Sequence, residues 1–236
     1  MRALAELFRL LLGSVATRGR LILLILLGVV PLAVGFLLGA NSDEPTRAWA
    51  PFASNYGLTL LAGVGSLVVA SATLGAPSED GTLVYLWLRP IARWRLAVAA
   101  YGAALTVMIP LVTIALGVGA ALARTPARTV SASISSGILA IAAYSAGFTW
   151  LGLRVKRPLA WGLGYILIWE GFVARAGHGA ARLAVAAYTR TVLARASGVS
   201  LRLADQAAWA SVAVPLAVAA VGLWLTARRL ARADVA

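Results

Sequence analysis

The chain has 236 residues, of which 61% are hydrophobic and 12% are charged, against about 25% charged in a typical soluble domain. This composition excludes an ordinary soluble domain and predicts an all-α polytopic membrane protein. The formal net charge of +13 would suit a nucleic-acid-binding protein, but the basic residues form short clusters between apolar runs. Membrane topology explains such clusters, so no nucleic-acid partner is expected. The absence of Cys excludes disulfides and Cys-based metal sites.

Near the N-terminus, apolar residues recur at helical spacing, and polar residues with one Gly lie on the opposite side. The apolar set is Leu4, Leu7, Phe8, Leu11 and Val15, and the opposite set is Arg2, Glu6, Arg9 and Gly13. This pattern predicts an amphipathic interfacial helix that lies in the membrane surface. The apolar run that follows is too long for a signal-peptide core and has Leu38 where a small residue is needed, so no cleavage is expected.

Six apolar runs approach or exceed the roughly 20 residues that a spanning helix needs, and we expect six transmembrane helices in a single domain, residues 1–236. The runs are residues 21–40, 56–76, 96–123, 130–153, 159–174 and 209–227. Pro110 favours a tilt or bend in the third run. Gly35 and Gly39 form a G-x-x-x-G pair that permits close helix packing, although the 23 Gly residues also produce such spacing by chance.

Lys and Arg are retained on the cytoplasmic side of a membrane. With six spans both termini lie on one side, and the segments on that side hold thirteen of the 21 basic residues. Five of the eight others lie in one longer segment, residues 175–202, which leaves three in the remaining outer loops. The distribution therefore predicts that both termini and the loop 77–95 are cytoplasmic, and we expect the chain to lie in the cell membrane.

The loop 77–95 is the densest polar interruption between two apolar runs. Ser78 is a plausible N-cap, and Glu79 and Asp80 would suit the positive end of a helix dipole. Pro90 disfavours helical structure in the residue before it, so the predicted helix is short. Because it is more apolar than a solvated connector needs, we expect it to lie against the membrane or to dock into a groove of a partner.

The segment Glu79-Asp80-Gly81-Thr82-Leu83, continued by Leu88-Arg89-Pro90-Ile91-Ala92-Arg93, resembles a pattern of the ABC-2 type permeases. These are membrane subunits of ATP-binding cassette exporters of the type V-like kind, and the pattern lies between their second and third spans. Trp169-Glu170-Gly171 is a second, less specific match. The layout of six spans, an interfacial helix and a longer outer segment before the last span is similar along essentially the whole chain.

This resemblance implies a coupling helix that inserts into a cleft of a P-loop ATPase subunit. The implied coupling residues are Glu79, Asp80, Gly81, Thr82, Leu83, Trp87, Arg89, Pro90 and Arg93. It also implies two permease copies, or one copy and a related permease, together with an ATPase pair that binds ATP and Mg. The chain itself has no G-x-x-x-x-G-K-[ST] segment, so we expect no cofactor in it and no catalytic activity. Its expected role is export of a hydrophobic or amphipathic small molecule or lipid by alternating access.

Glu170 is the one clear ionisable residue inside a predicted span, where an unpaired central charge costs roughly 2.5 to 3.5 kcal/mol. The segment 175–202 is too charged to cross the membrane, and we expect it to form re-entrant or surface helices as an outer cap. Glu170 could accept hydrogen bonds from the cap backbone or pair with Arg175 or Arg182. An outer gate and direct substrate contact are the alternative roles.

Two other classes of function remain. A channel or secondary transporter without an ATPase would carry more polar residues along its spans. An intramembrane enzyme would need a nucleophile and a His inside the bundle, but His178, the single His, falls in the outer segment. One His without Cys or a carboxylate cluster is also a poor metal site, so no metal is expected.

Overall fold

The computed structural model describes residues 2–15, 17–79, 92–173, 178–202 and 204–232, and these residues form helices with no strand among them. The helices are α1 (Arg2–Val15), α2 (Arg18–Asn41), α3 (Pro45–Phe52), η1 (Ala53–Val64), α4 (Gly65–Glu79), α6 (Arg93–Leu122), α7 (Ala127–Arg154), α8 (Pro158–Gly164), η2 (Tyr165–Glu170), α9 (His178–Ala181), α10 (Val185–Ser197) and α11 (Ala208–Arg232). The segments η1 and η2 are π-helical. The all-α prediction is confirmed for this part of the chain.

Five helical stretches are long and apolar enough to cross a membrane: α2, the continuous helix Pro45–Gly75, α6, α7 and α11. They correspond to the first, second, third, fourth and sixth predicted spans, which supports a multi-pass membrane protein. The second begins earlier than predicted, at Pro45. Pro110 lies inside α6, which continues past it to Leu122.

The predicted fifth span, residues 159–174, is not a long continuous helix. In its place α8 and η2 together contain 13 residues and end at Glu170. Thirteen residues extend about 20 Å along a helix, against about 30 Å for the hydrocarbon core of a bilayer. The predicted fifth span, and with it the predicted total of six spans, is therefore not confirmed.

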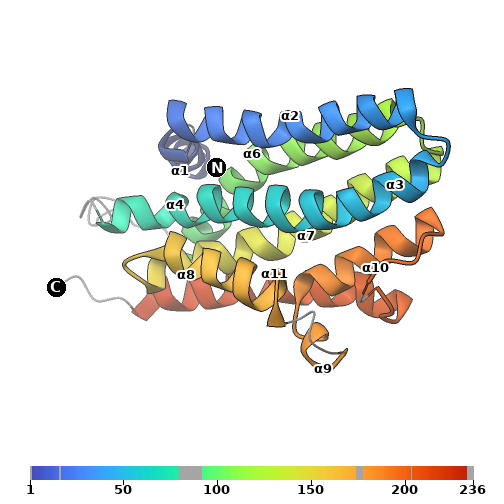
Figure 1. Ribbon diagram of the computed structural model, residues 1–236. Helices are drawn as coiled ribbons and strands as arrows, with labels where there is room; N and C mark the ends of the chain where they lie inside the picture. The colour runs from blue at the N-terminus through green and yellow to red at the C-terminus, as the bar shows by residue number, and fades with distance from the viewer. Residues whose placement is uncertain (1, 16, 80–91, 174–177, 203, 233–236) are drawn as a thin grey trace.

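The long helices lie side by side in a bundle, with Pro45–Gly75 among the others and α2 along one face (Figure 1). The helix Pro45–Gly75, called the central helix below, has 83% of its most apolar 18-residue stretch buried inside the protein, whereas α2 has 22%. The side chains that α2 exposes are large and apolar, including Ile22, Ile25 and Phe36. An outer surface of this kind suits contact with lipid rather than water.

The start of α1 and the end of α11, the described residues nearest the two termini, lie at one end of the bundle, as do the end of α4 and the start of α6 (Figure 1). These two helix ends flank the loop that the sequence places on the same side as the termini. The arrangement agrees with the predicted relation between the loop and the termini, while the cytoplasmic assignment of that end stays a prediction.

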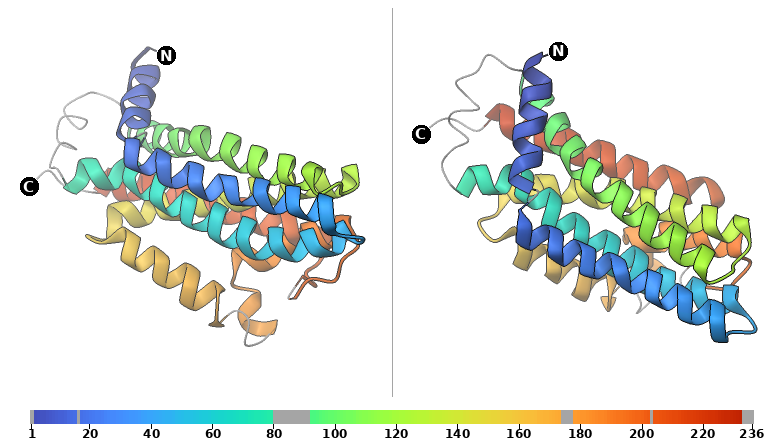
Figure 2. Two further views of the ribbon diagram at one scale, coloured as in Figure 1. Left: turned by 45° about the horizontal axis from the view of Figure 1, so that its top comes forward. Right: turned by 90° about the horizontal axis from the view of Figure 1, so that it is seen from above.

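The predicted amphipathic helix is present as α1, which lies across the end of the bundle (Figure 2). Its residues Leu7 and Leu11 are buried in a cluster with Leu96 of α6 and Leu74 of α4, and Arg9 is exposed. The apolar face of α1 therefore packs on the protein itself.

The helices α2 and α6 approach each other closely at the Gly pair of α2. A Cβ atom added to Gly35 would meet the carbonyl group of Gly119, and one added to Gly39 would meet the carbonyl of Leu122. Both contacts are with backbone, which cannot rotate away. The G-x-x-x-G pair thus has the packing role that the sequence permitted.

This contact predicts that Gly35→Ala lowers the free energy of unfolding by about 1 to 3 kcal/mol, because the added methyl group overpacks a backbone contact. The matched control is Gly19→Ala in the same helix, where nothing lies within 4 Å of the added atom. Thermal unfolding of both variants in detergent measures the difference. Equal stability of the two variants would contradict the close contact.

Candidate functional site

The helical path that follows α7 is interrupted between the two ends of the bundle. From the end that carries the termini, α8 and η2 run inward and stop at Glu170, and α10 begins at Val185 and continues toward the opposite end (Figure 1). Ten of the thirteen residues of α10 are buried. The sequence left open whether this segment forms re-entrant or surface helices, and burial of α10 inside the bundle excludes a surface helix there.

Glu170 lies at the break, with 1% of its surface exposed. Its carboxylate accepts hydrogen bonds from the Tyr144 hydroxyl, from the Tyr165 hydroxyl at 3.0 Å and from the Val185 backbone N–H at 3.1 Å. Val185 is the first residue of α10, and the first N–H groups of a helix have no partner within it. Since no side chain of the N-cap residue Ala184 caps α10, Glu170 performs this function from the end of η2.

Arg190 of α10 is 5% exposed and lies near enough to Glu170 for its positive charge to act on the carboxylate. Its Nη2 atom also donates a hydrogen bond of 2.9 Å to the Thr59 hydroxyl of η1. A carboxylate and a guanidinium can be buried away from water only when each has a hydrogen-bonding or oppositely charged partner. The network therefore joins α7, η2, α10 and the central helix.

Of the interactions expected for Glu170, the hydrogen bond from the backbone of the following segment is confirmed by Val185. Arg182 is exposed, and Arg175 lies outside the described residues. The sequence offered these two residues as charge partners and missed Arg190. Arg190 stands among the charged residues of 175–202, and only folding of α10 into the bundle separates it from the exposed ones.

An apolar pocket of about 370 Å³ lies against this network. Tyr144, Tyr165 and Val185 belong to both the pocket and the network. The rest of the wall includes Phe148, which stacks on Tyr144 with ring centroids 5.9 Å apart, and the exposed Trp161. An apolar or aromatic ligand would fit this lining, with the buried carboxylate one side chain away.

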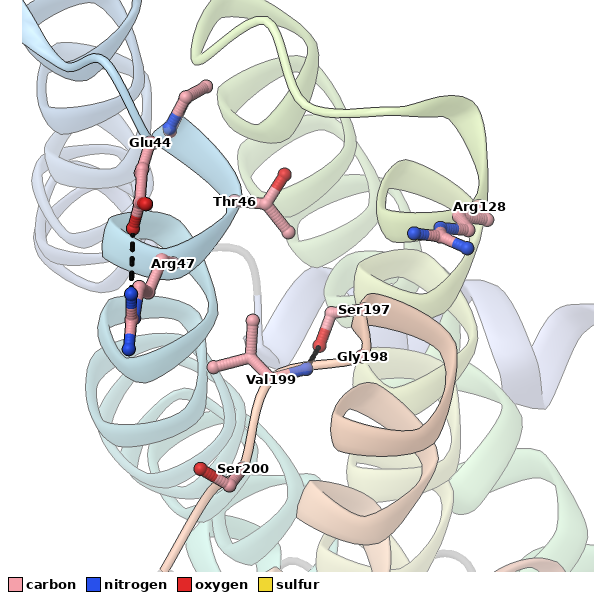
Figure 3. A pocket seen from close by; sticks show the side chains of 9 residues that line it. Glu44, Thr46, Arg47, Arg128, Ser197, Gly198, Val199 and Ser200 are labelled. Atoms are coloured by element: carbon pink, nitrogen blue, oxygen red, sulfur yellow. Dashed lines mark hydrogen bonds and ion pairs between the residues drawn. The ribbon is translucent and has the colours of Figure 1, made fainter.

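A second pocket, of about 440 Å³, lies between the start of α3, the start of α7 and the residues after α10 (Figure 3). Arg47 and Glu44 form an ion pair of 3.0 Å there, with side chains 77% and 66% exposed. Arg128 also lines it. Because its charged groups are solvated and partly paired with each other, this pocket is a weaker candidate site than the buried network.

The other residues singled out by the sequence lie elsewhere. Glu79 ends α4 and Arg93 begins α6, both at the end of the bundle that carries the termini. His178 begins α9, and its side chain is outside the described part. In the described residues no three His, Asp or Glu side chains come together as a metal site. The remaining implied coupling residues, Asp80, Gly81, Thr82, Leu83, Trp87, Arg89 and Pro90, lie outside the described residues.

No protein-family model matches the chain, and no curated protein is similar enough to be matched with it. The candidate site therefore rests on its own geometry.

The network predicts that Tyr165→Phe and Glu170→Gln each lower the free energy of unfolding by about 1 to 3 kcal/mol, because each leaves a buried polar group short of a partner. The double variant should lose less than the two single losses added together, since both act on one hydrogen bond. Thermal unfolding in detergent measures all three variants.

Tyr188→Phe is the matched control, because its hydroxyl donates to the carbonyl of Arg182 and not to Glu170. Combined with Glu170→Gln it should give an additive loss. Additive losses for Tyr165 and Glu170 as well would contradict the network.

Proposed function

We propose that the chain is the permease subunit of an ATP-binding cassette exporter in the cell membrane. In this proposal the chain crosses the membrane six times, with α8–η2 and α10 forming the fifth crossing in two parts. Both termini and the loop 77–95 are cytoplasmic, and the ATP and Mg are bound by a separate pair of ATPase subunits. A second copy or a related permease completes the membrane part.

The observation that carries the proposal is the buried carboxylate at the helix break, next to an apolar pocket, in a bundle with an apolar outer surface. Interrupted helices at membrane depth are costly and are tolerated where the free backbone groups find partners. Transporters use such breaks to form substrate sites and moving joints. The aromatic lining favours a hydrophobic or amphipathic substrate over an ion.

A connected path supports coupling between the loop 77–95 and the break. The loop begins in the last residues of α4, which continues directly from η1 as part of the most buried of the long helices. Thr59 of η1 accepts the hydrogen bond from Arg190, and Arg190 lies beside Glu170. A displacement of the loop by an ATPase would thus be transmitted along η1 and α4 and through the side chains of Thr59 and Arg190 to the break at Glu170.

Glu170 acts in this proposal as part of the outer gate. Its carboxylate holds the start of α10 in the state described here, and a state in which α10 has moved would lose that hydrogen bond. ATP binding changes the equilibrium between the two states because the ATPase subunits bind one state more tightly.

The coupling role predicts that the Glu79→Lys/Asp80→Lys variant inserts normally but retains about tenfold less ATPase on co-purification, equivalent to roughly 1.4 kcal/mol of binding free energy. The variant reverses the charge at the end of α4 and at the next residue of the expected coupling segment. Asp43→Lys/Glu44→Lys, the same charge change at the opposite end of the bundle, is the control. If the wild-type chain binds no P-loop ATPase in its native membrane, the exporter proposal fails.

The gating role predicts that Glu170→Gln leaves assembly with the ATPase intact and slows transport by about tenfold, the effect of roughly 1.4 kcal/mol on a rate-limiting step. The readout is ATP-driven accumulation of a fluorescent amphipathic dye in inside-out vesicles. Glu44→Gln, which removes an exposed ion pair, should transport normally. Normal transport by Glu170→Gln would contradict the gating role and leave Glu170 with a structural role only.

A further inference from the structure

A third hollow, of about 370 Å³, lies at the end of the bundle that carries both termini. Its walls come from the start of α2, from α4 and from the residues that lead into α8. Two kinds of residue line it: the cations Arg20, Lys156 and Arg157, and small or apolar side chains such as Val68, Ala72 and Leu159.

The charges in this hollow have one sign. None of the described residues that line it is acidic, and its three cations come from two separate segments, the start of α2 and the residues before α8. Retention of basic residues on the cytoplasmic side accounts for cations at this end of the bundle. It does not account for a hollow in which cations from separate segments converge beside an apolar wall.

The hollow lies where the spanning helices end. Arg20 stands in the first turn of α2, and Lys156 and Arg157 follow the end of α7 at Arg154. Large exposed apolar side chains begin just beyond them, at Leu21 on α2 and at Leu159 on α8. The change from cationic to apolar surface over a few residues matches the boundary between lipid headgroups and acyl chains.

We propose that this hollow binds an anionic phospholipid, with its phosphate against Arg20, Lys156 and Arg157 and the first part of an acyl chain along Val68, Ala72 and Leu159. A zwitterionic lipid fits less well, because its ammonium group would enter the field of the same cations. The bound lipid would bridge α2, α4 and the start of α8. The inference needs only a membrane and does not depend on the exporter function.

The test uses the full chain in a neutral detergent, titrated with phosphatidylglycerol or with phosphatidylcholine of the same acyl chains and followed by native mass spectrometry. We expect phosphatidylglycerol to bind about tenfold more tightly, since each basic residue near a headgroup contributes appreciably to binding. The triple variant Arg20→Gln/Lys156→Gln/Arg157→Gln should lose this preference. Arg228→Gln/Arg229→Gln/Arg232→Gln, with the same loss of charge on α11 outside the hollow, should keep it.

Ala160→Trp tests the hollow with all three cations in place, because the large ring occupies the space beside the exposed Ala160. It should weaken phosphatidylglycerol binding as the triple variant does, and Lys156→Gln alone, at an exposed position, should weaken it in part. Three results would overturn the proposal: equal binding of the two lipids, equal loss in both triple variants, and displacement of the lipid by millimolar inorganic phosphate. The last result would identify a site for a free anion.

Discussion

A helix that begins inside an apolar bundle leaves its first backbone N–H groups without partners, and this fold depends on how that requirement is met at Val185, the first residue of α10. The carboxylate of Glu170 accepts the Val185 N–H, and the hydroxyls of Tyr144 and Tyr165 complete its shell. A carboxylate buried away from water needs hydrogen-bond donors, and the first N–H groups of a buried helix need hydrogen-bond acceptors. The segment α8–η2 and the helix α10 therefore stabilise each other at the break.

The packing around the break brings the network together. The central helix Pro45–Gly75 is surrounded by the others, and its π-helical stretch carries Thr59, the partner of Arg190. The second π-helical stretch, η2, carries Tyr165 and Glu170. A π-helix is less favourable than an α-helix and often marks a functional site, so the occurrence of both stretches at one network strengthens the case for function there.

The two proposals use different parts of the molecule. The break and its apolar pocket lie between the ends of the bundle, where a substrate in the membrane would pass. The cationic hollow lies at the end that carries the termini, where α2, α4 and α8 meet. Because α8 begins at the hollow and continues as η2 to Glu170, a lipid held there would also fix the position of α8 and η2.

The sequence by itself determined the all-α class, the amphipathic helix α1 and the five helices that are long and apolar enough to cross a membrane, because apolar length and helical periodicity are local properties. It also identified Glu170, since one carboxylate in an apolar run is conspicuous. The break was wrongly predicted as a continuous span, because residues 159–174 are apolar up to and beyond the point where η2 ends. Only the tertiary structure decided that Arg190 is buried and Arg182 exposed: both stand in one charged segment, and the difference arises from the packing of α10 against its neighbours.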